Sequence, residues 1–111
     1  MKVALVTGAS RGLGAVIARE LAKSGWAVAV NYAHDVDGAA RVVSDIESQG
    51  GKAVAVRFSV IDGKQLGPGL DEIKRLLGSV DLIVNNATGP QPEMPILAQS
   101  GRHISISSNS S

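Results

Sequence analysis

Short apolar runs alternate along the chain with segments in which apolar residues recur at helical spacing. The runs Val3–Val6 and Trp26–Tyr32 are too short for helices and are typical of strands that are buried on both faces. Between them, apolar residues recur every three or four positions until Ser24-Gly25 ends the pattern, at Ala15, Ile17, Ala18, Leu21 and Ala22. The first part of the chain therefore predicts a strand, a tight turn, a helix and a second strand.

The same alternation continues, less regularly, in the middle of the chain. A second helix ending at Gly50-Gly51 is indicated by an apolar stripe of Ala39, Ala40, Val43 and Ile46. The later elements are expected at Lys52–Phe58 (strand), Leu70–Leu77 (helix, with Ile73, Leu76 and Leu77 inward) and Val80–Val84 (strand). We expect this third helix to begin only after Gly67-Pro68-Gly69, because both residue types are unfavourable inside a helix.

Strands that alternate with helices pair in parallel through right-handed crossovers, which predicts an α/β fold with helices on both faces of the sheet. The pattern changes after Asn86, because Thr88–Gly101 contains three prolines and two glycines and has room only for a short helix at Met94–Gln99. A fifth strand at His103–Ser107 is just reachable across this link. The predicted strand order is 3-2-1-4-5, without a covering helix between strands 4 and 5.

Composition narrows the classes of partner and chemistry. The chain has 111 residues, which we expect to form one domain (1–111), and its 11 basic and 10 acidic residues leave a net charge of +1. No charge run indicates nucleic acid or an anionic membrane as a partner. There is no cysteine, and His34 and His103 lie far apart, so neither thiolate chemistry nor a metal site is expected. The short apolar N-terminus predicts a soluble cytoplasmic protein.

The strongest candidate for chemistry is the glycine-rich turn after the first predicted strand. Gly8, Gly12 and Gly14 allow positive φ angles and close approach of a ligand, while the following helix directs its N-terminal amides at an anion such as a pyrophosphate. The strict G-x-G-x-x-G pattern and a P-loop are both absent. Glycines that only let the helix pack against the strand would give the same pattern, so this turn alone leaves both interpretations open.

Two motifs together resemble one family. Thr7-Gly8-Ala9-Ser10-Arg11-Gly12-Leu13-Gly14 is similar to the cofactor turn of the short-chain dehydrogenase/reductase family, and Asp81-Leu82-Ile83-Val84-Asn85-Asn86-Ala87 resembles its Asn-Asn-Ala-Gly motif, with Thr88 in place of the glycine. The resemblance implies a Rossmann-like doubly wound sheet and an NAD(P)(H)-dependent oxidoreductase that interconverts a carbonyl and an alcohol. The cofactor-binding residues that it implies are Gly8, Ser10, Arg11, Gly12, Leu13, Gly14, Asn31, Tyr32, Val60, Asn86 and Ala87.

The end of the second strand bears on the choice of cofactor. An Asp or Glu about 20 residues beyond the glycines would bind the ribose hydroxyls of NAD, but the chain has Asn31 there. The missing carboxylate and the guanidinium of Arg11 favour NADP, whereas Asp35 would favour NAD if it took the ribose role. Ser59 stands where the family usually has the aspartate that holds adenine, which leaves the Val60 backbone for that contact.

The resemblance does not extend to a complete catalytic set. The family uses a tyrosine with a lysine four residues later, but the only tyrosine here is Tyr32, which is followed at that spacing by Val36. Ser108 matches the family's catalytic serine, although a polar tail explains it equally well. We therefore expect a truncated, catalytically incomplete chain. The resemblance implies a full-length parent that interconverts a carbonyl and an alcohol with NADP, with 3-oxoacyl thioester reduction one plausible substrate class. The alternative is a non-catalytic dinucleotide-binding or interaction module, and self-association would cover the apolar surface left by the missing helix.

Overall fold

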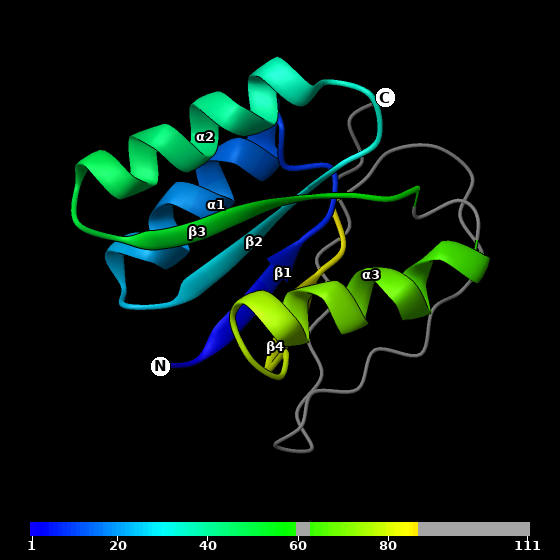
Figure 1. Ribbon diagram of the computed structural model, residues 1–111. Helices are drawn as coiled ribbons and strands as arrows, with labels where there is room; N and C mark the ends of the chain where they lie inside the picture. Colours follow the sequence, from blue (N-terminus) through cyan, green and yellow to red (C-terminus); the bar gives the residue numbers. More distant parts are fainter. Residues whose placement is uncertain (60–62, 87–111) are drawn as a thin grey trace.

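The computed structural model describes residues 1–59 and 63–86, which form a sheet with helices on both faces (Figure 1). The strands are β1 (Val3–Val6), β2 (Ala27–Tyr32), β3 (Lys52–Arg57) and β4 (Leu82–Val84). They lie in the order β3-β2-β1-β4, and every neighbouring pair is parallel. The predicted order of the first four strands is confirmed. The fifth strand expected at His103–Ser107 and the short helix expected at Met94–Gln99 lie outside the described residues.

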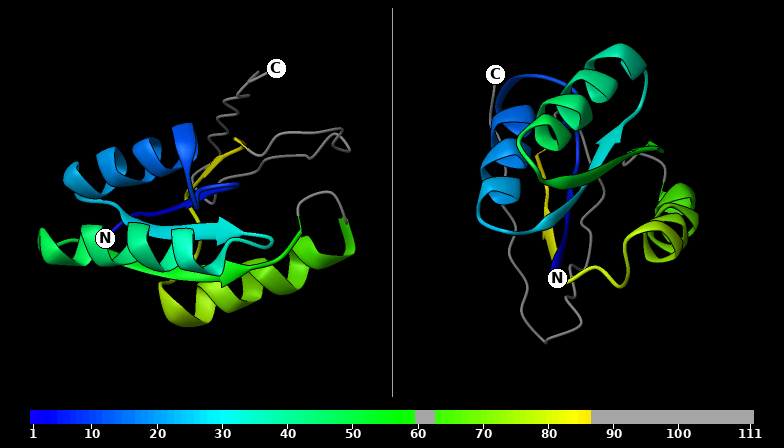
Figure 2. Two further views of the ribbon diagram at one scale, coloured as in Figure 1. Left: turned by 90° about the horizontal axis from the view of Figure 1, so that it is seen from above. Right: turned by 60° about the vertical axis from the view of Figure 1, so that its left-hand side comes forward.

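Three helices cover the sheet in these residues. α1 (Gly12–Lys23) and α2 (Val36–Ser48) lie together on one face, and α3 (Gly63–Leu76) lies on the other, as Figure 2 shows. Side chains of successive strand residues point to opposite faces, so one core includes Val28 and Val30 while the other includes Ala27, Ala29 and Ile73. No helix within residues 1–59 and 63–86 is long and apolar enough to cross a membrane.

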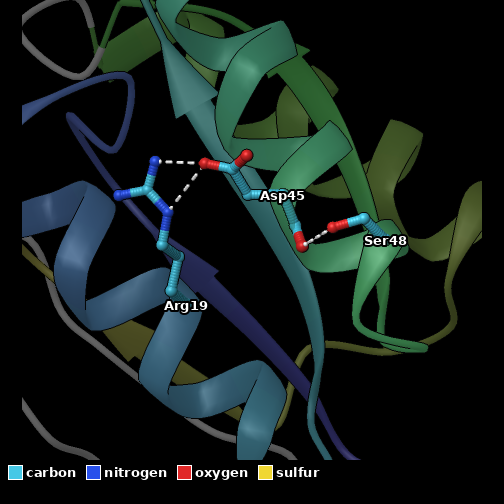
Figure 3. Close-up of polar contacts among 3 residues, drawn as sticks. All are labelled: Arg19, Asp45 and Ser48. Atoms are coloured by element: carbon cyan, nitrogen blue, oxygen red, sulfur yellow. Dashed lines mark hydrogen bonds and ion pairs between the residues drawn. The ribbon is translucent and has the colours of Figure 1, made fainter.

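An ion pair joins α1 and α2. The Arg19 guanidinium donates to Asp45 Oδ2 from Nη2 at 2.6 Å and from Nε at 3.2 Å, and the Ser48 hydroxyl donates to the Asp45 carbonyl (Figure 3). Because the two paired side chains are 34% and 45% exposed, solvent screens this contact and it adds little to stability. The buried alanines Ala15 and Ala18 are the residues that let α1 lie close to the sheet.

The apolar stripe predicted for α2 is partly wrong. Ala39 and Ile46 are buried as expected, but Ala40 is exposed and Val42 is buried in its place. Val42 follows Ala39 by three positions and precedes Ile46 by four, so these three residues form the inward stripe. Alanine is small enough to be tolerated on either side of a helix, which made Ala40 a poor guide to the buried face.

The predicted start of the third helix is also wrong. α3 begins at Gly63 and continues through Pro68, where a boundary was expected. Gly67 has no Cβ to clash with the proline ring, which removes the usual obstacle to a helical residue before proline. Gly69 is buried against Phe58, and a Cβ on Gly69 would lie only 2.5 Å from the Phe58 ring. Packing of this helix on the β3 end therefore outweighs its poor helix propensity.

The inward face predicted for the third helix needs one correction. Ile73 is fully buried and Leu77 packs at the edge of the same core, both as expected. Leu76 is 39% exposed because it lies at the margin of the inward stripe, which runs through Leu66, Leu70, Ile73 and Leu77. As predicted, this helix is followed by β4, and the second motif lies at the end of that strand.

Candidate cofactor site

The turn between β1 and α1 has the backbone that its glycines predict. Gly8 and Gly12 have φ angles of 59° and 62°, in the left-handed region that favours glycine. Ala9 is fully buried between them, whereas Arg11, Gly12 and Leu13 are exposed. The turn thus anchors one residue in the core and presents the next few, with the first amides of α1, to solvent at the carboxyl end of the sheet.

The N-termini of α1 and α2 differ in a way that matters for anion binding. The residue that precedes α1, Arg11, makes no side-chain capping hydrogen bond, and no acidic residue lies in the first turn of α1. α2 is capped by Asp35, whose Oδ1 accepts from the Gly38 amide at 3.0 Å, and it carries Asp37 in its first turn. Of these two helices, α1 therefore leaves its positive end and its first amides without an anionic partner from its own first turn or from the residue before it.

The two motifs are bonded to each other through Thr7, which is fully buried at the end of β1. Its Oγ1 accepts from the Asn86 amide at 2.9 Å and lies 3.3 Å from the Val84 carbonyl and 3.2 Å from Asn85 Oδ1. The Thr7 amide donates to the same Val84 carbonyl at 3.0 Å. This hydroxyl fixes the end of β4 against the glycine turn. The sequence did not predict this role, because the motif does not show where the Thr7 side chain points.

Asn86 contributes both a contact and an unpaired acceptor to the site. Its Nδ2 donates to the Gly8 carbonyl at 3.1 Å, while Oδ1 is buried and has no hydrogen-bond partner in the described part of the chain. The residue is only 5% exposed. A Cβ on Gly14 would overlap Asn86 Nδ2 and the Gly8 carbonyl oxygen, so a side chain at that position would close the space in which the motifs meet.

Asn31 lies at the predicted place but points inward. It is 2% exposed, and its side chain accepts from the Gly8 amide and donates to the carbonyls of Phe58 and Val56. A direct contact between this side chain and the cofactor ribose stays a prediction. The inward direction of the side chain disfavours it. Tyr32, the next residue, is half-buried on the face that carries α1 and α2.

The remaining predicted residues divide into two groups. Ser10 is half-buried, and its carbonyl oxygen would lie 2.5 Å from a Cβ on Gly38, so the turn packs against the start of α2. Val60, Ala87 and Ser108 lie outside the described residues. In residues 1–59 and 63–86, no group of three His, Cys, Asp or Glu side chains is placed to hold a metal ion.

Comparison with known proteins agrees with this arrangement of sheet, turn and second motif. The family model described as short chain dehydrogenase matches residues 2–110. The chain therefore belongs to the short-chain dehydrogenase family, and its parallel sheet is the Rossmann-like sheet that the two motifs predicted.

Particular relatives extend the likeness to reductases. The 3-oxoacyl-[acyl-carrier-protein] reductase FabG of Staphylococcus epidermidis is 46% identical over 86 residues, which are 78% of this chain and 35% of that protein. Elsinochrome reductase 1 of Elsinoe fawcettii is also 46% identical over 86 residues, covering 78% of this chain and 32% of the relative. The chain thus spans about a third of the length of the curated relatives it matches.

Solved structures show the same partial coverage. The angucycline C-6 ketoreductase LanV with bound NADP is 44% identical with a TM-score of 0.72, over 79% of this chain and 37% of that one. A short-chain dehydrogenase/reductase from Serratia marcescens is 40% identical with a TM-score of 0.76, over 79% of this chain and 36% of that one.

Proposed function

We propose that this chain binds NADP(H), with the pyrophosphate at the turn between β1 and α1. The observation that carries the proposal is the uncapped start of α1, where the first amides follow two glycines with positive φ and no acidic residue competes for them. A helix N-terminus of this kind stabilises a bound anion through its amides and its dipole.

Asn86 Oδ1, which has no hydrogen-bond partner within residues 1–59 and 63–86, is an independent reason to expect a ligand beside the turn. A buried acceptor without a donor costs about 1–3 kcal/mol, so such groups are rare unless a ligand or water satisfies them. Oδ1 and Nδ2 belong to the same side-chain amide, and Nδ2 donates to the Gly8 carbonyl. The buried oxygen therefore lies beside the turn. The hydroxyls and the carboxamide of a dinucleotide are donors of the kind that this oxygen lacks.

The charges around the turn favour the phosphorylated cofactor. Arg11 is exposed and forms no ion pair within residues 1–59 and 63–86, which leaves its guanidinium available for the 2′-phosphate of NADP. Asp35, the acid that would favour NAD, accepts instead from the Gly38 amide at the start of α2. The LanV structure, which contains NADP, supports the same choice by similarity.

The bound nicotinamide would supply or accept a hydride, whereas the residues described above would bind and orient it. We infer that the 111 residues bind cofactor without turning over substrate, because they contain no tyrosine followed by a lysine at the fourth position. That absence favours a second candidate, a dinucleotide-binding module. In a longer protein, reduction of a carbonyl compound such as a 3-oxoacyl thioester is the activity that we propose from the likeness to FabG.

The cofactor preference is tested by titrating the 111-residue chain and its Arg11→Ala variant with NADPH and NADH. Loss of a charge-assisted contact of about 1.5–3 kcal/mol should weaken NADPH binding by roughly tenfold or more and leave NADH binding nearly unchanged. Arg41→Ala is the matched control, because Arg41 is an exposed arginine on α2 and its removal changes the net charge equally. Equal affinities of the unmodified chain for the two cofactors would refute the NADP assignment.

The expectation of binding without turnover has its own assay. Oxidation of NADPH by the 111-residue chain in the presence of 3-oxoacyl thioesters and simple ketones should stay at the rate seen without substrate. Turnover that depends on the carbonyl compound would show that an acid outside the Tyr-x-x-x-Lys pattern completes the site.

A further inference from the structure

The two peptide groups that flank Gly8 are each held by an asparagine side chain, one in β2 and the other after β4. Asn31 Oδ1, at the end of β2, accepts from the Gly8 amide at 3.0 Å, and Asn86 Nδ2, after β4, donates to the Gly8 carbonyl at 3.1 Å. Gly8 has a positive φ of 59°. Two asparagines thus fix the orientations of the two peptide groups that flank Gly8 at the start of the cofactor turn, and we call this pair the Gly8 clamp.

Asn31 connects the clamp to β3 as well. Its Nδ2 donates to the Phe58 carbonyl at 3.0 Å and lies 3.4 Å from the Val56 carbonyl, and its own carbonyl accepts from the Ala9 amide at 2.8 Å. The residue is 2% exposed, and these bonds satisfy both polar atoms of its side chain inside the protein. One side chain therefore ties the turn after β1 to the ends of β2 and β3.

We propose that Asn31 is a positioning residue, which sets the geometry of the Gly8 turn for the cofactor and does not select between NADP and NAD by touching the ribose. The importance of this position for binding rests on the proposed function, whereas the clamp itself stands on the hydrogen bonds given above. The simple rule that an acid at the end of the second strand selects NAD does not apply here, because the side chain faces the Gly8 amide and the β3 carbonyls.

The variant Asn31→Asp separates the two roles. It keeps an acceptor for the Gly8 amide but replaces the donor to Phe58 and Val56 with a carboxylate that faces their carbonyl oxygens. A positioning role predicts that NADPH and NADH affinities both fall, by roughly tenfold, which corresponds to about 1.4 kcal/mol, and that their ratio is preserved. A ribose contact predicts stronger NADH binding, and a change of the ratio by about tenfold in favour of NADH would overturn the proposal.

Matched measurements separate a positioning role from general destabilisation. Ile73→Val removes one methylene from the core between α3 and the sheet, on the face opposite to α1 and α2. This variant should be less stable, but the folded chain should bind cofactor as tightly as before. Asn31→Ala removes both the acceptor and the donor and should weaken both cofactors at least as much as Asn31→Asp. Unchanged affinities in a folded Asn31→Ala variant would overturn the proposal.

Amide hydrogen exchange keeps the test independent of binding and of the folding of the variants. In the unmodified chain, the Gly8 amide should exchange much more slowly than the Leu13 amide. Leu13 is a residue of the uncapped first turn of α1 and is 51% exposed. Comparable exchange rates would rule out the clamp. If the unmodified chain binds neither cofactor while Gly8 is protected, the proposed function fails and the clamp stands as a structural contact without a role in binding.

Discussion

Gly14→Ala probes the point at which the two motifs meet. The added methyl group would overlap the Asn86 side-chain nitrogen and the Gly8 carbonyl, and it would approach Ala9 Cα to 3.0 Å. Two of these three neighbours are backbone atoms, so they have little freedom to move aside. Such overpacking costs about 1–3 kcal/mol, and loss of the bond from Asn86 to Gly8 adds about 0.5–1.5 kcal/mol.

One favourable effect opposes this cost. Replacement of glycine by alanine in a helix gains up to about 1 kcal/mol, so we expect a net destabilisation of about 1–3 kcal/mol. With a urea dependence of about 1–3 kcal/mol per molar, the unfolding midpoint should fall by on the order of 1 M. Urea unfolding followed by far-ultraviolet circular dichroism measures this shift.

Ser44→Ala is the control for the helical gain, because Ser44 is exposed within α2 and the substitution fills no restricted space. Its stability should change by no more than about 0.5 kcal/mol. The reasoning is refuted if Gly14→Ala unfolds at the same urea concentration as the unmodified chain or at a higher one, because the contacts of Gly14 would then have no energetic consequence.

Substitutions at two further positions test the hydrogen bonds around the site. Asp35→Ala removes the cap of α2 and should lower the free energy of unfolding by about 1 kcal/mol, whereas Asp35→Asn should keep most of that stability; equal losses in the two variants would contradict the capping role. Thr7→Val is nearly isosteric but leaves the buried Asn86 amide without its acceptor, so a loss of about 1–3 kcal/mol is expected in the same unfolding assay, and a neutral result would show that the bond to Asn86 is dispensable.

The sequence was sufficient for the sheet and for the place of the turn. Valine- and alanine-rich runs separated by helical stripes require parallel strands buried on both faces, and Gly8 and Gly12 take the positive φ angles that only glycine adopts freely. Both signals are local, because they depend on residues within one element or one turn. The order of the first four strands is that of a doubly wound sheet, in which right-handed connections place helices on both faces.

The directions of individual side chains could not be predicted from the sequence, because they depend on contacts between segments that are far apart in the chain. In a strand buried on both faces, alternation does not say which face each residue meets, so the sequence does not predict that the Asn31 side chain faces the Gly8 amide. The propensities of Gly67 and Pro68 predict a helix boundary, but the contact of Gly69 with Phe58 holds α3 in place across them. Such contacts join segments that only the folded chain brings together.

A binding isotherm of NADPH on the unmodified 111-residue chain, recorded beside one for NADH, tests the central claim that the β1–α1 turn holds a phosphorylated dinucleotide. We predict saturable binding with one site per chain, tighter for NADPH, together with amide shifts at Gly12, Leu13 and Gly14 in the first turn of α1. A chain that is folded by circular dichroism and yet binds neither cofactor would contradict the account.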